Sequence, residues 1–168
     1  MELLEGILTR RSVRSYSNEP VSDDDLRQIL TAAAMAPSGL NNQPWRFVTI
    51  RSDEVKKDLS ELTRYRRIIS SAPVLVAVFI DTESMYHEVK DHQGIGACIQ
   101  NMLLAAHGLG LGAVWLGEIL KSAEQVRLRL GVPERMELMA VIAMGHPDGQ
   151  PGERTTRLPL NSLLLKEL

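Results

Sequence analysis

The sequence predicts an α+β fold in which a central sheet lies between two layers of helices. Helical and strand-like segments are mixed along the 168 residues, and one long helical segment joins two strand-like segments. No repeat, linker or change of composition divides the chain. A chain of this length can bury a sizeable core, so we expect a single domain over residues 1–168.

Capping residues and apolar periodicity place the helices. Ser22 precedes three aspartates, residues 23–25, which suit the positive end of a helix dipole, and Pro37 stops the apolar stripe that follows. Ser122 and Gln125 have the spacing of a capping box, which predicts a helix that ends at the next glycine. The other predicted helices cover residues 3–10, 52–63 and 89–108.

Four apolar segments predict strands. The segment VLVAVFI, residues 74–80, is rich in β-branched residues and apolar at every position, which is typical of a buried strand. The predicted strands cover residues 46–50, 74–80, 112–117 and 136–145. Even the longest strongly apolar run is far too short to span a bilayer, so we expect no membrane partner.

The predicted helix 89–108 is apolar on almost every side. Its apolar and small residues are Ile95, Ala97, Cys98, Ile99, Met102, Leu103, Leu104, Ala105 and Ala106. Such a helix needs cover all round, and Gly94 and Gly96 would let another backbone approach closely. The segment LPLNSLLL, residues 158–165, is apolar although it follows a loop. Both features predict a homodimer.

Composition excludes several classes of function. The net charge is -2, so no overall positive field indicates binding to nucleic acid. The single cysteine, Cys98, cannot form an intramolecular disulfide and favours a reducing compartment. The first residues, MELLEGILTRR, carry acids where a signal peptide needs basic residues and an apolar core. We therefore expect a soluble, cytoplasmic protein.

Two loops carry candidate binding residues. The segment TRRSVRSY places Arg10, Arg11 and Arg14 close to Ser12. A guanidinium group can bind two phosphate oxygens at once, so this motif suits a phosphate. Taken alone, however, the motif is more simply interpreted as a solvated basic turn. The segment APSGLNNQPW, residues 36–45, is longer and richer in small and amide residues than a simple connection needs.

Other patterns support no site or leave alternatives open. His87 and His92 are five residues apart and do not share a helix face, so we expect no metal site. The glycines of HGLGLGAVW follow a helix and precede a strand, which is the reverse of a dinucleotide-binding motif. Cys98 is expected to pack in the core rather than to act as a nucleophile. The segment RYRRII, residues 64–69, is either a solvated helix face or a contact to a nucleotide phosphate.

The order of these motifs is more specific than any one of them. RRSVRSY, APSGLNNQPWRF, GIGACIQNMLLAAHGLGLGAVWLG and RLPL follow one another with spacing that resembles the FMN-dependent nitroreductase family, from Leu3 to Leu160. The compact length is similar to that of the short bacterial and archaeal members. The resemblance implies a three-layer sandwich with a mostly antiparallel sheet, an intertwined homodimer, and FMN at the dimer interface.

The resemblance also assigns residues to the cofactor. Arg10, Arg11, Ser12 and Arg157 would hold the phosphate and ribityl chain, and Arg14 would face the pyrimidine edge, where a cation stabilises reduced flavin. Residues implied to lie by the flavin ring are Pro37, Ser38, Gly39 and Asn41 from one subunit, with Leu116, Gly117 and Glu118 from the other. The backbone N–H groups of this second set would face flavin N5.

Two positions depart from the family pattern. Gly39 stands where many relatives have a serine, so one hydroxyl contact is lost. Thr155 stands where many relatives have a second basic residue before the final arginine, and Arg154 is the nearest substitute.

The implied activity is a ping-pong oxidoreductase. NADH or NADPH would donate a hydride to flavin N5, and a nitroaromatic, a quinone or a related small acceptor would then be reduced in the same cleft. No protein acid or base is required, so no catalytic residue is assigned. The alternatives are an ene-reductase or dehalogenase of the same fold, a dimeric flavin-binding or sensing module without turnover, and a cofactor-free helical interaction protein.

Overall fold

Four antiparallel strands form one sheet at the centre of the structure. The structure is a computed structural model and describes residues 2–149 and 156–168. The strands are β1 (Trp45–Ile50), β2 (Val74–Asp81), β3 (Gly112–Leu116) and β4 (Met136–Gly145), in the spatial order β1-β2-β4-β3. Every neighbouring pair is antiparallel, and the four predicted strands are confirmed.

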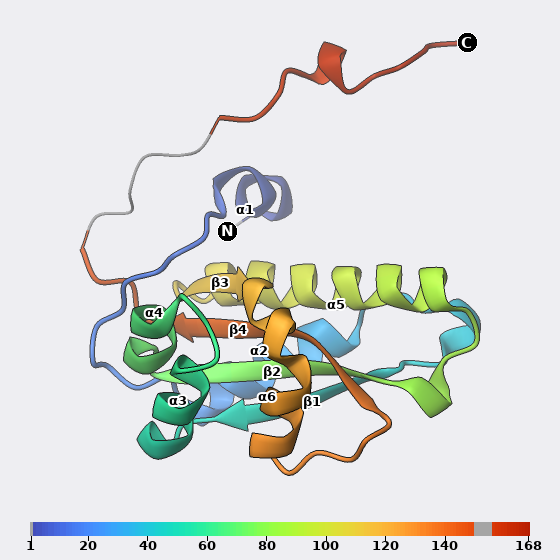
Figure 1. The fold of residues 1–168 in the computed structure, drawn as a ribbon. Coiled ribbons are helices and arrows are strands. Elements are labelled where there is room, and N and C mark those ends of the chain that lie inside the picture. The colour runs from blue at the N-terminus through green and yellow to red at the C-terminus, as the bar shows by residue number, and fades with distance from the viewer. Residues whose placement is uncertain (1, 150–155) are drawn as a thin grey trace.

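Helices cover both faces of this sheet (Figure 1). The α-helices of the described residues are α1 (Leu3–Thr9), α2 (Asp23–Ala34), α3 (Asp53–Ser60), α4 (Arg66–Ser71), α5 (Glu88–Gly108) and α6 (Ala123–Arg129). Short 3₁₀ helices are η1 (Gly39–Asn41), η2 (Thr82–Ser84), η3 (Glu118–Ser122) and η4 (Leu160–Ser162).

Strand β2 is buried on both faces, which explains why apolar and polar residues do not alternate along its sequence. Val76 and Val78 belong to the core that α2 and α5 form with one face of the sheet. Leu75 and Phe79 belong to the second core, which α3, α4 and α6 form with the other face. A strand buried on both faces reads as a continuous apolar run, and the three-layer sandwich is confirmed.

The predicted start of α2 is confirmed, but the capping box before α6 is wrong. The Ser22 Oγ accepts a hydrogen bond from the backbone N–H of Asp25 at 3.0 Å. Ser122 is instead the last residue of η3, and its φ and ψ of -119° and 25° are not the extended values of a typical cap. Its hydroxyl donates to the carbonyl oxygen of Leu62 at 3.0 Å, so a tertiary contact has replaced the local cap.

The predicted helix 52–63 ends earlier than expected. The Ser52 cap is present, but α3 ends at Ser60, and a separate helix, α4, begins at Arg66. Ile68 and Ile69 of α4 are buried in the second core. The segment 64–69 therefore has an apolar helical side that packs on the sheet, beside exposed arginines.

The long helix α5 is buried on one side by its own chain. Ile95, Ile99 and Met102 lie in the core against α2 and the sheet. Leu104 is only half-buried, and nothing lies within 4 Å of the position that a side chain at Gly96 would take. The described residues of the chain leave this second side of α5 partly exposed. Within the described ranges, no helix has the length and apolar character needed to cross a membrane.

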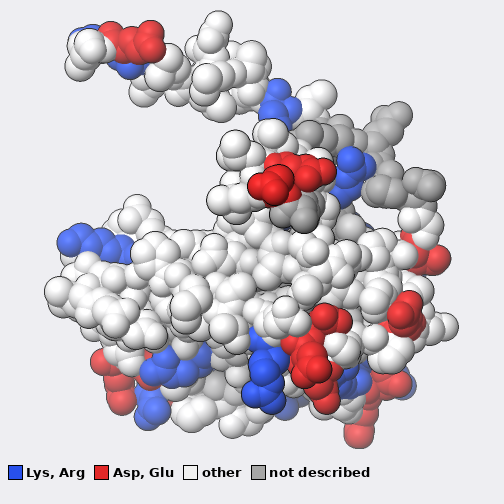
Figure 2. Space-filling view, turned by 180° about the vertical axis from the view of Figure 1, so that it is seen from behind, with Lys and Arg blue, Asp and Glu red and all other residues white. Residues whose placement is uncertain are grey.

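Apolar segments at both ends of the chain project from the sandwich (Figure 1). Leu3, Leu4 and Leu8 of α1 are 71%, 72% and 61% exposed, and Leu160 and Leu165 of the last segment are 73% and 99% exposed. Figure 2 shows a broad area with few charged side chains between these projecting segments and the charged lower half of this face. The two ends of the chain thus expose more leucine side chains than is usual on the surface of a folded monomer.

Candidate functional site

The segment after α1 runs beside the edge strand β3. Ser12 forms a parallel bridge with Ala113, and the Val13 N–H donates to the Ala113 carbonyl oxygen at 3.1 Å. A Cβ at Gly112 would lie 2.5 Å from Val13 Cγ1, so this close approach requires a glycine. The bridge continues the register toward Arg14, which lies next to the end of β3.

Positive charges from distant parts of the sequence meet near the end of α5. Burial lowers the pKa of Arg10, and the nearby charge of Arg157 lowers it further. Burial also lowers the pKa of His107 on α5, with additional contributions from Arg10 and Arg11. Groups that disfavour one another's charge in this way can share an anionic ligand. The departures at Arg154 and Thr155 lie outside the described residues.

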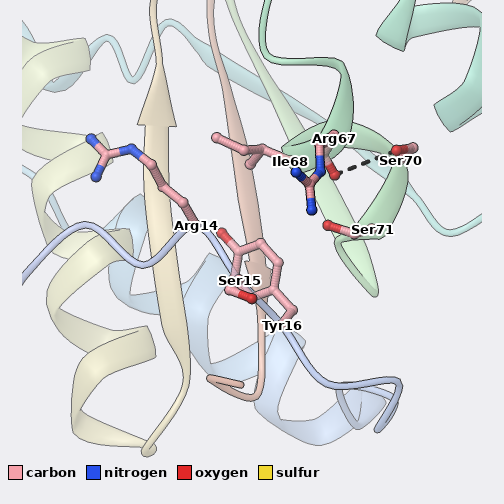
Figure 3. A pocket seen from close by; sticks show the side chains of 7 residues that line it. All are labelled: Arg14, Ser15, Tyr16, Arg67, Ile68, Ser70 and Ser71. Carbon is pink, nitrogen blue, oxygen red and sulfur yellow. Dashed lines mark hydrogen bonds between the residues drawn. The ribbon is translucent and has the colours of Figure 1, made fainter. Parts of the chain in front are cut away.

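A polar cavity of about 470 Å³ lies between the segment 14–16 and α4 (Figure 3). Its lining residues are Arg14, Ser15, Tyr16, Arg67, Ile68, Ser70 and Ser71. Figure 3 shows Arg14 extending across β3, whereas Arg67 points from α4 toward Tyr16. The sequence pattern left the role of Arg67 open, and in the structure it lines the same cavity as Arg14, with its side chain on the Tyr16 side.

Tyr16 forms the floor of this cavity. Its hydroxyl donates to the carbonyl oxygens of Val13 at 2.7 Å and Ala143 at 3.0 Å. Burial raises the pKa of Tyr16, so the phenol stays protonated. These bonds join the segment that carries Arg14 to the central strand β4. Tyr16 is therefore held in a fixed position on this side of the cavity.

The turn after β3 is held by the side chain of Glu118. This carboxylate accepts hydrogen bonds from Thr63 Oγ1 at 2.5 Å and from the Arg64 N–H at 3.2 Å, and it pairs with Lys121. The bond with Lys121, followed by the bond with Thr63, lowers the pKa of Glu118 to about 2. Gly117 beside it is exposed. Gly117 is thus the exposed residue of the predicted turn, while the Glu118 side chain anchors the turn to the α3–α4 connection.

The loop 37–43 has an unusual backbone. Leu40, Asn41 and Gln43 have φ values of 54°, 55° and 45°, a region that residues other than glycine seldom adopt. The Ser38 Oγ accepts a bond from the Gln43 N–H at 3.1 Å, and Gln43 Nε2 donates to the Asn41 carbonyl oxygen at 3.1 Å. Conformations of this kind persist where the surroundings determine them, and they are frequent at ligand sites.

The same loop is anchored at its end to the start of α5. Trp45 is buried, and the Asp81 N–H donates to the Pro44 carbonyl oxygen at 2.8 Å. Asn42 Nδ2 donates to Asp91 Oδ1 at 2.7 Å and to the Ser84 carbonyl oxygen at 3.0 Å. Asp91 is a buried carboxylate that sequence reasoning missed, because its pattern resembles any charged first turn of a helix.

The two halves of the predicted site lie near opposite ends of α5 in one chain. The Pro37 carbonyl oxygen is 3.5 Å from the position of a Cβ at Gly94, whereas Arg10 and Arg11 lie near His107. A helix rises about 1.5 Å per residue, so these points are about 20 Å apart along α5. One chain therefore brings Arg10–Arg14, Arg157 and the turn 116–118 to one region, and the loop 37–43 to another.

Cys98 lies outside both regions. It is buried in the core against α2, and burial raises the pKa of its thiol to about 12. This environment favours a packing role, as expected. Across residues 2–149 and 156–168, no group of three or more His, Cys, Asp or Glu side chains could hold a metal ion.

Comparisons with known proteins agree with this architecture. The sequence model of the nitroreductase family matches residues 7–66 and 61–146. A protein of Archaeoglobus fulgidus, provisionally named NADH dehydrogenase/NAD(P)H nitroreductase, is 39% identical over 149 residues, which cover 87% of this chain and 86% of that protein.

Solved structures are similar over nearly the whole chain. A provisionally named nitroreductase of Desulfovibrio desulfuricans in complex with FMN is 51% identical, with a TM-score of 0.94 over 99% of this chain and 97% of that chain. The NADPH:FMN oxidoreductase of Vibrio harveyi complexed with NAD+ is 28% identical, with a TM-score of 0.89 over 98% of this chain and 76% of that chain. The chain belongs to the nitroreductase family.

Proposed function

We propose that this protein is an FMN-dependent oxidoreductase that transfers a hydride from NADH or NADPH to a small acceptor such as a nitroaromatic or a quinone. The observation that carries the proposal is the proximity of Arg10 and Arg157, because mutually repelling cations close together suit a phosphate. The relatives named above, one of them in complex with FMN and another with NAD+, support the same cofactor and donor.

The residues around β3 fit the polar parts of FMN. Arg10, Arg11, Ser12 and Arg157 would hold the phosphate and ribityl chain. Arg14, whose segment is held in place by the hydrogen bonds of Tyr16, would face the pyrimidine edge of the flavin. The cavity beside it adds Arg67, and a second guanidinium there would further favour negative charge on a reduced flavin.

The turn Leu116–Glu118 would present its backbone to the flavin ring. FMN, when bound, supplies the hydride-accepting and hydride-donating centre at N5. The chain contributes the orientation of this ring through the N–H groups of Gly117 and Glu118. The Glu118 side chain holds the turn in place from behind, and no protein acid or base is needed.

A second copy of the chain would complete the site. Because about 20 Å of α5 separates the loop 37–43 from Arg10 within one chain, the loop reaches a cofactor only in a partner subunit. Pro37, Ser38, Gly39 and Asn41 would then lie by the partner's flavin. The half-buried side of α5 and the exposed leucines of the two chain ends would supply the apolar interface. The reducing cytoplasm, where NADH and NADPH are available, is the location we propose.

Titration of the purified protein with FMN tests the cofactor site. R10A and R157A are each expected to weaken FMN binding about tenfold or more, because a charge-assisted hydrogen bond contributes about 1.5–3 kcal/mol. R129A, which removes an exposed cation from α6, is the matched control and should bind FMN like the wild type. Equal affinity of all four proteins would contradict the proposed phosphate site.

Anaerobic addition of NADH or NADPH to the FMN-loaded protein tests the activity. Bleaching of the flavin absorbance, followed by its return when a nitroaromatic or a quinone is added, is the expected result. Retained flavin that neither nicotinamide bleaches would instead favour a binding or sensing module.

A further inference from the structure

Tyr86 occupies the space that a side chain at position 39 would fill. A Cβ at Gly39 would lie 2.0 Å from the Tyr86 hydroxyl oxygen and 2.3 Å from its Cε1 atom. Tyr86 is 42% exposed, and its hydroxyl forms no hydrogen bond to another residue of the described chain. The phenol of Tyr86 therefore lies over Gly39, the one residue of the loop 37–43 without a side chain. Its O–H group is free to donate a hydrogen bond.

The backbone around Tyr86 is held firmly in this place. Asp91 Oδ2 accepts hydrogen bonds from the N–H groups of Tyr86 at 2.9 Å and His87 at 2.8 Å, while its Oδ1 accepts from Asn42 at 2.7 Å. Burial alone would raise the pKa of Asp91, but these donors outweigh it and lower the pKa, so the carboxylate stays charged. One buried anion thus joins the Tyr86 segment, the loop 37–43 and the first turn of α5.

We propose that Tyr86 is a specificity-determining residue, whose phenol replaces the missing side chain at Gly39 and donates a hydrogen bond to an oxygen atom of the electron acceptor. This inference rests on the proposed function, in which the loop 37–43 lies over the partner's flavin. Tyr86 reaches the loop from a separate segment and is 42% exposed, with Lys90 Nζ 5.4 Å from the centroid of its ring. A small ligand that enters beside the loop can therefore reach the phenol.

The chemistry of this position selects a class of acceptor. A phenol offers one O–H donor and an aromatic face. Nitroaromatics and quinones combine a flat ring with oxygen atoms that accept hydrogen bonds. Tyr86 would therefore favour such acceptors over apolar ones of similar size, and it does so without extra loop residues, because its position is already fixed by Asp91.

The contact with Gly39 provides an independent way to displace the phenol. A methyl group at position 39 cannot coexist with an oxygen atom at 2.0 Å, and the flexible end of Tyr86 must move away. G39A should therefore have the same effect on acceptor binding as Y86A. In the Y86A background, the G39A substitution should add nothing, because the ring that it displaces is already absent.

The test uses the FMN-loaded oxidised protein and 4-nitrobenzoate, with binding followed by perturbation of the flavin absorbance in the absence of any reductant. Y86F should raise the Kd of this probe about fivefold, which corresponds to the loss of one hydrogen bond. Y86A and G39A should raise it further and equally. The FMN affinity of Y86F and Y86A should stay unchanged. V89A, which truncates an exposed side chain three residues after Tyr86, is the matched control.

Three outcomes would overturn the inference while leaving the proposed function intact. The first is a wild-type Kd for Y86F, which removes only the hydroxyl and preserves the ring. The second is a full additional effect of G39A in the Y86A background. The third is a loss of FMN affinity in Y86F, which would make Tyr86 a cofactor residue. Failure of the wild-type protein to retain FMN would overturn the proposed function, and this inference with it.

Discussion

At the residue scale, the side chain of Glu118 anchors the turn that follows β3. Its carboxylate turns away from the outward side of the turn and binds Thr63, Arg64 and Lys121. Sequence reasoning assigned Glu118 to the site but gave no role to its charge, because two of its partners lie more than fifty residues away and the third is in the same short 3₁₀ helix. Only the fold brings the α3–α4 connection against the end of β3.

The stabilising effect of this carboxylate should depend on pH. The pKa of Glu118 is lowered from 4.5 to about 2, so its interactions contribute stability above pH 4.5 and lose it as the pH falls toward 2. Thermal unfolding of the wild type and E118Q across this range measures the effect. The wild type should be the more stable at pH 6, and the difference in Tm should shrink as the pH falls below 4.5. A difference that does not vary with pH would contradict this assignment.

At the scale of single elements, the two predicted serine caps had different outcomes. Ser22 accepts from the Asp25 N–H and also donates to the Asp25 carboxylate at 2.7 Å, so the first turn of α2 is closed by local bonds. Ser122 has the same kind of sequence signature, yet it is the last residue of η3 and its hydroxyl donates to the Leu62 carbonyl oxygen. A cap forms only where the preceding backbone is extended, which local sequence does not ensure.

S22A is therefore expected to lower the free energy of unfolding by about 1 kcal/mol, the usual effect of removing a serine cap. Urea denaturation measures this loss. S22N, which keeps a side-chain acceptor at the cap, should unfold like the wild type. A loss of equal size in both variants would show that the hydroxyl acts through something other than the cap.

At the scale of the whole molecule, the fold divides its site between the two ends of α5. The loop 37–43 lies near Gly94, and the arginines lie near His107. The same helix leaves Leu104 outside both hydrophobic cores and only half-buried. Assembly of two chains along α5 would cover this side and join the two halves of the site, so dimerisation and cofactor binding should be lost together.

L104E tests this coupling. A carboxylate on the uncovered side of α5 should prevent a second copy from packing there, since a charge buried at an apolar interface is costly. Light scattering coupled to size-exclusion chromatography should show a monomer, and FMN retention should fall sharply. L128E, on the exposed side of α6, should leave both properties unchanged. A dimeric L104E protein that keeps FMN would place the interface elsewhere.

Much of the secondary structure and the family could be predicted from sequence alone. The apolar run 74–80, the Ser22 cap and the proline-rich loop before β1 are signals between residues close in the chain, and the order of the motifs indicated the nitroreductase family. The break between α3 and α4 and the burial of one side of α4 were not predicted, because the few residues of α4 provide hardly two turns of periodicity.

Only the tertiary structure decided which groups the side chains around the candidate site contact. The burial of Asp91, the contact of Tyr86 with Gly39 and the cavity that Arg67 lines together with Tyr16 each join segments that no local pattern relates. Propensities and caps depend on neighbours in the sequence, so the sequence by itself determined the elements and their family. Hydrogen bonds and close packing between side chains depend on which surfaces the fold brings together, so only the three-dimensional structure could decide them.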